Sequence, residues 1–129
     1  MRSYTQAFAE RTGIRVIFKT DPSVENLSNE QTAVLYRVLQ ESLTNVAKHA
    51  FAHQVRIILT QQDASLSMEI EDDGKAFKVE TCQALSSVGL GILGMQERVR
   101  SGNGVMMIRS VAGVGTTISV AMPFHDPSP

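Results

Sequence analysis

The chain has 129 residues, with 12 lysines and arginines against 13 aspartates and glutamates. Its length suits one domain and is too short for two. The balanced charge argues weakly against nucleic acid as a main partner, because proteins that bind the phosphate backbone usually carry a basic excess. The single cysteine, Cys82, excludes an internal disulfide and a four-cysteine zinc site and fits a reducing compartment.

The first half of the chain predicts a short helix, a strand and a long helix. Residues 3–12 have helical spacing and end at Gly13, and residues 14–19 alternate as a strand. A capping box at Ser28 begins the long helix, which we expect over residues 28–50. Its apolar stripe consists of Leu35, Val38, Leu39, Leu43, Val46 and Ala50.

The second half predicts four strands and one helix. In chain order, these are a hairpin of strands 55–60 and 66–71, a long loop over 72–88, a helix that follows Gly89-Leu90-Gly91 and ends near Gly102, and strands 105–111 and 116–122. Loops beyond about 12–15 residues in a compact domain are usually functional or disordered. Apolar runs are shorter than a membrane span and a signal core is lacking, so we expect a cytoplasmic chain, which leaves open an anchor elsewhere in a longer parent.

The order of elements predicts the fold class. Strands arrive in antiparallel pairs and the helices are separated from them, which is typical of an α+β protein. We therefore expect a two-layer α/β sandwich, with a mixed, mostly antiparallel sheet of about five strands and three helices on one face.

Three polar residues share one face of the long helix. Glu41, Asn45 and Lys48 follow at spacings of four and three, with His49 beside them. An amide oxygen near a carboxylate can hold Mg²⁺ or its water shell, and a lysine one turn on can reach a phosphate. On spacing alone, a solvated polar face is the simpler interpretation, so both stay open.

Two further motifs begin or end strands. Asp72-Asp73-Gly74 closes a strand, where a carboxylate can accept a hydrogen bond from an amino group and a glycine lets the backbone approach a flat ligand. An ordinary acidic turn explains the same residues. Thr116 and Thr117 follow Gly115, and their hydroxyls can bond a base or a water, although β-branched residues also favour strands without any ligand.

Gly89, Gly91 and Gly94 have the spacing G-x-G-x-x-G. A Rossmann site is excluded, because no strand precedes the first glycine and no acidic residue follows about 20 positions on. Glycines before a helix still favour an anion site, since free N–H groups and the helix dipole point at the ligand. The long loop ahead of them would suit a lid.

The order of these motifs resembles the sensor histidine kinases. Residues 41–50 are similar to the N box, 72–77 to the first glycine box, 89–98 to the second, and 115–117 to the closing threonine motif. The resemblance covers about residues 14 to 122. The Gly94-Met95-Gln96-Glu97-Arg98 ending is similar to the nitrate-sensor type, whose partners are usually response regulators with LuxR-type DNA-binding domains.

The resemblance implies the Bergerat fold of gyrase, Hsp90 and MutL, with ATP and Mg²⁺ as cofactors. It assigns Asn45 to the metal and to catalysis, Glu41 to a water or the attacking group, Lys48 and His49 to phosphate, Asp72 and Gly74 to adenine, Gly89, Gly91 and Gly94 to the lid base and the phosphate site, and Thr117, more than Thr116, to adenine through a water.

The implied reaction transfers the γ-phosphoryl of ATP to a histidine on a separate dimerising hairpin. Residues 1–13 would be the linker helix from that hairpin, 14–123 the ATP-binding catalytic domain, and 124–129 a disordered tail. The fragment would be monomeric and poorly active alone, within a homodimeric kinase.

Two alternatives remain: a nucleotide-binding or interaction module of this fold without kinase activity, and an anti-sigma-type serine kinase. Ala76, where the family usually has a second glycine, supports the first alternative, because its methyl group would crowd the nucleotide. The ending at residues 94–98 favours the histidine kinase.

Overall fold

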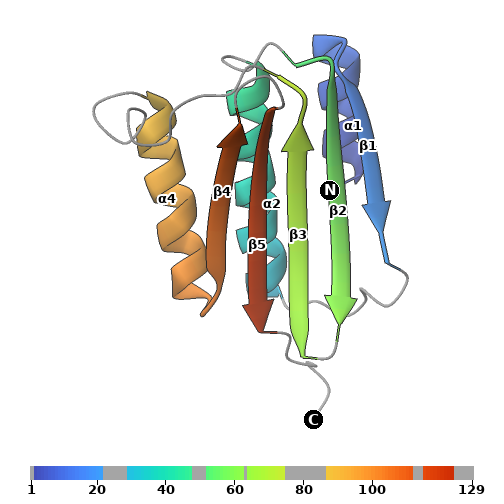
Figure 1. The fold of residues 1–129 in the computed structure, drawn as a ribbon. Helices are drawn as coiled ribbons and strands as arrows, with labels where there is room; N and C mark the ends of the chain where they lie inside the picture. The colour runs from blue at the N-terminus through green and yellow to red at the C-terminus, as the bar shows by residue number, and fades with distance from the viewer. Residues whose placement is uncertain are drawn as a thin grey trace.

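The computed structural model describes residues 2–21, 29–47, 52–62, 64–74, 87–111 and 115–123 (Figure 1). Their elements, in chain order, are α1 (Arg2–Thr12), β1 (Arg15–Thr20), α2 (Asn29–Asn45), β2 (Gln54–Gln62), β3 (Ser65–Asp72), α4 (Ser87–Ser101), β4 (Val105–Val111) and β5 (Gly115–Pro123). Residues 46–47 continue α2 as a π-helical turn. Within the described ranges, no helix is both long and apolar enough to cross a membrane.

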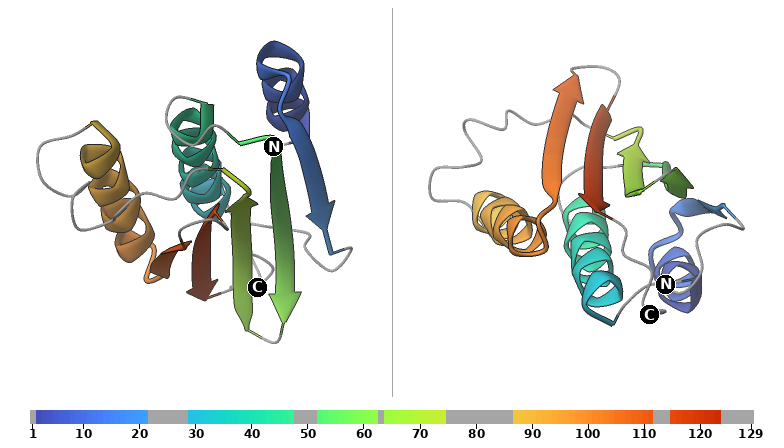
Figure 2. Two further views of the ribbon diagram at one scale, coloured as in Figure 1. Left: turned by 45° about the horizontal axis from the view of Figure 1, so that its top comes forward. Right: turned by 90° about the horizontal axis from the view of Figure 1, so that it is seen from below.

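The strands form one five-stranded sheet in the order β1-β2-β3-β5-β4. β1 runs parallel to β2, and the other neighbouring pairs are antiparallel, including the expected hairpin of β2 and β3. Viewed along the strands, α1, α2 and α4 all lie on one side of the sheet (Figure 2, right). The predicted α+β sandwich with a mixed sheet is confirmed.

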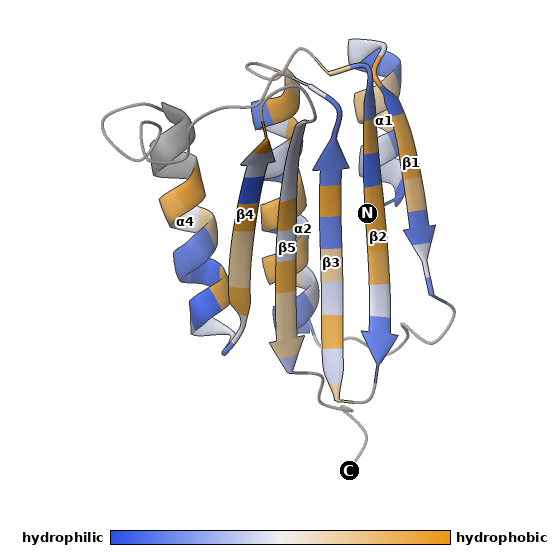
Figure 3. Ribbon diagram, in the orientation of Figure 1, coloured by the Kyte–Doolittle hydropathy of each residue, from blue (hydrophilic) through white to orange (hydrophobic). Residues whose placement is uncertain are grey.

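The core fills the space between the helices and the covered face of the sheet. Hydropathy alternates along β2 and β3, as expected when one face is covered and the other meets water (Figure 3). The predicted stripe of α2 is buried at Leu35, Val38, Leu39, Leu43 and Val46, whereas Ala50 lies outside the described residues. Burying one such side chain contributes about 1.5–3 kcal/mol, so the stripe is the main attachment of α2 to the sheet.

The helix α1 packs on the same core. Its Phe8 is 1% exposed, and the guanidinium of Arg2 lies 5.1 Å from the ring centroid of Phe18 on β1. The rings of Tyr4 and Tyr36 meet edge to face at 5.5 Å, which joins α1 to α2. A connection from α1 to another domain stays a prediction, and residues 124–129 lie outside the described residues.

Candidate functional site

A small pocket lies between α2, α4 and the covered face of the sheet. It is lined by Ser42, Asn45, Val46, Ile70, Asp72, Ile92, Thr116 and Ile118. Its volume is about 10 Å³, which is roughly the room that one water molecule needs. A larger ligand would therefore bind across its mouth or displace lining side chains. Two residues predicted from separate motifs, Asn45 and Asp72, are brought together here.

Asp72 is the buried carboxylate of this pocket, with 8% of its surface exposed. Its Oδ1 accepts a hydrogen bond of 2.9 Å from the N–H of Gly74. Burial raises the pKa of Asp72 above its ordinary value, backbone N–H groups of Gly74 and Thr116 oppose that rise, and the negative charges of Asp73 and Glu71 add to it. A ligand amino group that donates to Asp72 would favour its ionised form.

Gly74 turns the chain directly after β3. The bond from its N–H to a side chain two residues earlier closes an Asx-type turn, and the glycine itself is half-buried. This geometry keeps Gly74 beside Asp72, as the sequence predicted. Lys75 and Ala76, the next residues of the motif, lie outside the described residues.

Asp73 holds the end of β3 to the start of β2. Its Oδ1 accepts hydrogen bonds from the N–H groups of His53 at 2.9 Å and Gln54 at 3.0 Å. These bonds, that of Gln54 above all, lower the pKa of Asp73. The side chain is exposed, so Asp73 fixes the strand end on which Asp72 is carried. The sequence motif gave no sign of this role.

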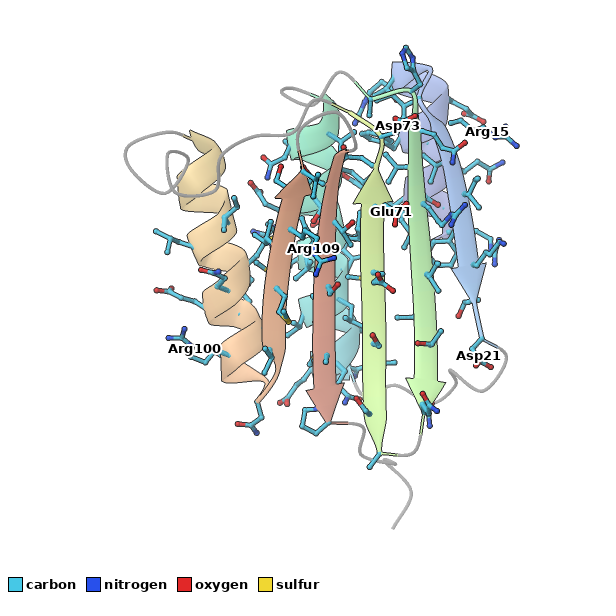
Figure 4. All side chains as sticks on the ribbon, viewed as in Figure 1. Arg15, Asp21, Glu71, Asp73, Arg100 and Arg109 are labelled. Atoms are coloured by element: carbon cyan, nitrogen blue, oxygen red, sulfur yellow. The ribbon has the colours of Figure 1, made fainter. Side chains whose placement is uncertain are left out.

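The hydroxyl beside Asp72 belongs to Thr116. Thr116 pairs with Asp72 across β3 and β5, is 2% exposed and lines the pocket. Thr117 pairs with Glu71 and lies with it and Arg109 on the face of the sheet that no described helix covers (Figure 4). The expectation that Thr117 lies near Asp72 is wrong, because successive residues of a strand point to opposite faces.

The start of β5 is pressed against the end of β3 at Gly115. Its φ of 133° is one that residues with a Cβ rarely adopt. A Cβ at this position would collide with the backbone carbonyl oxygen of Asp72. Gly115 thus allows the close approach that puts Thr116 beside Asp72. The Oγ1 of Thr116 lies 3.1 Å from the Oγ of Ser110 on β4, so the two hydroxyl groups share a hydrogen bond.

Glu41 lies one turn before Asn45 on α2, as expected, but it lines a different hollow. This groove of about 390 Å³ crosses the outer side of the helices, opposite the sheet, and is lined by Tyr4, Arg37, Gln40, Glu41, Thr44, Gly94, Met95 and Arg98. Glu41 and Gly94 are therefore brought together, and neither lines the Asp72 pocket. Lys48 and His49 lie outside the described residues.

The glycines Gly89 and Gly91 are part of α4, which begins at Ser87. The expectation that they precede the helix is wrong. A glycine costs about 1 kcal/mol in a helix interior, and the burial of Ile92, Met95 and Val99 outweighs that cost. The first four N–H groups of a helix have no acceptor within the helix. The N–H of Gly89, the third residue of α4, is one of these, whereas the N–H of Gly91, the fifth residue, is not.

Asn45 is the metal ligand that the sequence predicts. No group of three or more histidine, cysteine, aspartate or glutamate side chains converges within the described ranges. Magnesium commonly takes only one or two protein oxygens and completes its shell with water and substrate phosphates. Asn45 contributes one amide oxygen to the lining of the pocket, which fits a metal that arrives with a phosphate-bearing ligand.

Residues 30–126 match the family described as histidine kinase-, DNA gyrase B-, and HSP90-like ATPase. The chain belongs to this ATPase family. The predicted resemblance to sensor histidine kinases is confirmed by two relatives of the ATPase domain. The signal transduction histidine-protein kinase/phosphatase DegS of Brevibacillus brevis is 36% identical over 123 residues, which are 95% of this chain and 31% of that protein. The oxygen sensor histidine kinase NreB of Staphylococcus carnosus is 34% identical over 125 residues, which are 97% and 35%.

The ATPase domain spans about a third of the length of these relatives. Its fold is also that of the histidine kinase domain from the Erythrobacter litoralis EL346 blue-light activated histidine kinase. That structure superposes with a TM-score of 0.77 at 22% identity, covering 92% of this chain and 60% of the other. Both relatives carry the name of histidine kinases.

Proposed function

We propose that this ATPase domain binds ATP with Mg²⁺ and, within a longer protein, transfers the γ-phosphoryl group to a histidine. The observation that carries the proposal is the meeting of Asn45, Asp72 and Thr116 in one pocket of an ATPase fold. The names of the relatives support histidine as the acceptor.

Three residues of the pocket, and Gly74 next to Asp72, have roles in this proposal. Asp72 accepts a hydrogen bond from the adenine amine, Gly74 lies against the base, and Thr116 supports the base directly or through a water. The amide oxygen of Asn45 holds Mg²⁺, which supplies charge neutralisation for the phosphates.

The phosphate and acceptor side of the site extends beyond the pocket. Lys48 and His49 follow Asn45 and contact phosphate, and Gly89 offers its free N–H at the start of α4 to the same group. Glu41 polarises the attacking histidine or positions a water. It faces the outer groove with Gly94, which an acceptor helix can approach from outside.

The partners follow from the reaction. The acceptor histidine belongs to a dimerising helical hairpin, and α1 connects that hairpin to the ATPase domain. The phosphoryl group then passes from the histidine to a response regulator, of the LuxR type by resemblance. The isolated domain is monomeric and the parent kinase is a homodimer. Both act in the cytoplasm.

Calorimetric titration with a non-hydrolysable ATP analogue, with and without Mg²⁺, tests the nucleotide site. We expect binding that magnesium strengthens, and a loss of about 1.5–3 kcal/mol in Asp72→Ala, as for a lost hydrogen bond to a charged group. Glu71→Ala is the matched control, because that carboxylate lies next in the chain on the open face. A folded domain that binds no analogue at millimolar concentration contradicts the proposal.

The acceptor is tested on the full-length parent protein with γ-labelled ATP. We expect acid-labile phosphate on the protein, as phosphohistidine gives, and much less of it in the Asp72→Ala parent at limiting ATP concentration. Acid-stable phosphate would point to a serine kinase instead.

A further inference from the structure

Ser42 is a polar residue of the Asp72 pocket that lies within the N box but receives no role from it. It is 2% exposed and lines the pocket with Asp72 and Thr116. Its O–H donates to Sδ of Met95 on α4, at 3.6 Å. A thioether sulfur is a weak acceptor, and buried hydroxyl groups usually find better ones.

The hydroxyl of Thr44, on the same helix, makes a hydrogen bond within the helix that the hydroxyl of Ser42 does not make. Thr44 donates to the carbonyl oxygen of Gln40 at 2.8 Å, the local bond that hydroxyl side chains commonly make inside helices. The hydroxyl of Ser42 instead points from α2 toward α4 and the pocket. The Ser42 hydroxyl therefore lines the space that a ligand would enter, and its hydrogen bond to Met95 Sδ is weak enough for a ligand to replace.

The polar groups of the pocket are complementary in character. Ionised Asp72 accepts hydrogen bonds only, whereas the hydroxyl of Ser42 has a proton to donate and lone pairs to accept with. The hydroxyl of Thr116 is already paired with Ser110. A flat ligand that carries an amino group next to a ring nitrogen would match this pair, with its amine at Asp72 and its ring nitrogen at Ser42.

We propose that Ser42 is a second polar anchor for the base of the nucleotide. When the amine of a 6-aminopurine bonds Asp72, the Ser42 hydroxyl turns from Met95 Sδ to the adjacent ring nitrogen, N1, directly or through one water. This inference rests on the proposed function, since it assigns a further residue to the same base-binding pocket.

The test compares the wild type and the Ser42→Ala variant, each with two nucleotides. Wild type and Ser42→Ala are titrated with ATP and with 1-deaza-ATP, in which a C–H replaces N1, both with Mg²⁺. We expect Ser42→Ala to bind ATP about three- to tenfold more weakly, as for one lost hydrogen bond, and to bind 1-deaza-ATP as wild type does. Ser119→Ala, a serine on the open face of β5, is the control and should change neither affinity.

Met95→Leu separates base recognition from packing, because it removes the sulfur and keeps the side-chain volume. We expect it to lower the melting temperature and to leave ATP affinity within about twofold. If Ser42 serves only the α2–α4 contact, Ser42→Ala lowers the melting temperature and leaves ATP affinity unchanged, which overturns the inference. Equal losses for both nucleotides also overturn it. A folded wild type that binds neither nucleotide refutes the function itself, whereas ATP binding with an unaffected Ser42→Ala refutes Ser42 alone.

Discussion

Asp72 and Asp73 are neighbours in the chain, and each accepts backbone hydrogen bonds through Oδ1, but in opposite surroundings. Asp72 bonds the N–H of Gly74 inside the pocket, and Asp73 bonds the N–H groups of His53 and Gln54 at the exposed end of the sheet. Burial raises the pKa of Asp72, and the hydrogen bonds lower that of Asp73. Asp72 thus presents its carboxylate to the pocket, and Asp73 fixes the strand end that carries Asp72.

The two carboxylates should give opposite pH dependences of stability. A raised folded pKa means that the contribution of Asp72 is fully present below 3.8, its ordinary value, and is lost as pH rises through the folded pKa. The lowered pKa of Asp73 means that its contribution is present above 3.8 and is lost as pH falls through the folded pKa. Denaturant unfolding between about pH 3 and 7 measures both.

Asp72→Asn should therefore gain stability relative to wild type as pH rises above about 4. Asp73→Asn should lose about 1 kcal/mol at neutral pH, a small value for such bonds because water screens the exposed carboxylate, and the loss should shrink in acid. Two variants whose stability differences from wild type stay constant with pH would contradict both assignments.

Asn45→Ala should weaken magnesium-dependent nucleotide binding more than magnesium-free binding. The amide oxygen is a hard ligand that acts through the metal, so without the metal it contributes little. Calorimetry with the ATP analogue in Mg²⁺ and in a chelator gives the two losses. Equal losses in both would assign Asn45 to the pocket wall alone.

Thr116→Val should weaken nucleotide binding by about 1 kcal/mol, and Thr117→Val should leave it within about 0.5 kcal/mol. The two variants remove the same hydroxyl from adjacent residues, one beside Asp72 and one on the open face. Valine keeps the shape of threonine and suits a strand. Titration of both variants in parallel distinguishes the faces, and a larger loss at Thr117 would refute the placement.

Gly115→Ala should destabilise the domain by about 1–3 kcal/mol, because its φ is positive and a methyl group would meet the backbone of Asp72. Gly94→Ala should do the reverse. An added Cβ there meets nothing within 4 Å, and alanine is better than glycine in a helix by roughly 0.5–1 kcal/mol. Thermal unfolding of the pair gives both signs, and a Gly115→Ala variant as stable as wild type would disprove the strain.

Periodicity predicted the parts of this domain that depend on local pattern. The apolar stripe of α2 and the alternation of β2 and β3 each identify an element and its buried side without any partner. The family motifs then placed Asn45 and Asp72 in one site. Periodicity alone could not do so, because the two residues are 27 positions apart and lie on different elements, α2 and β3.

What the sequence could not provide depends on contacts between distant segments. The choice between Thr116 and Thr117 requires the register of β5 against β3, and a shift of one residue exchanges the two faces. The role of Asp73 arises from N–H groups 19 and 20 residues away. The start of α4 at Ser87 depends on packing that outweighs the low helix propensity of glycine.

The strand order also sets a condition on folding. β5 is the last of the described strands along the chain, yet it lies between β3 and β4 in the sheet. During synthesis, β4 emerges first and can join the sheet only after β5 has followed it. The hydroxyl groups of Ser110 and Thr116 therefore meet late, and the pocket wall that they form is completed only when residues 115–123 have left the ribosome. A stalled or truncated chain that lacks this strand would have Asp72 without its neighbour in β5.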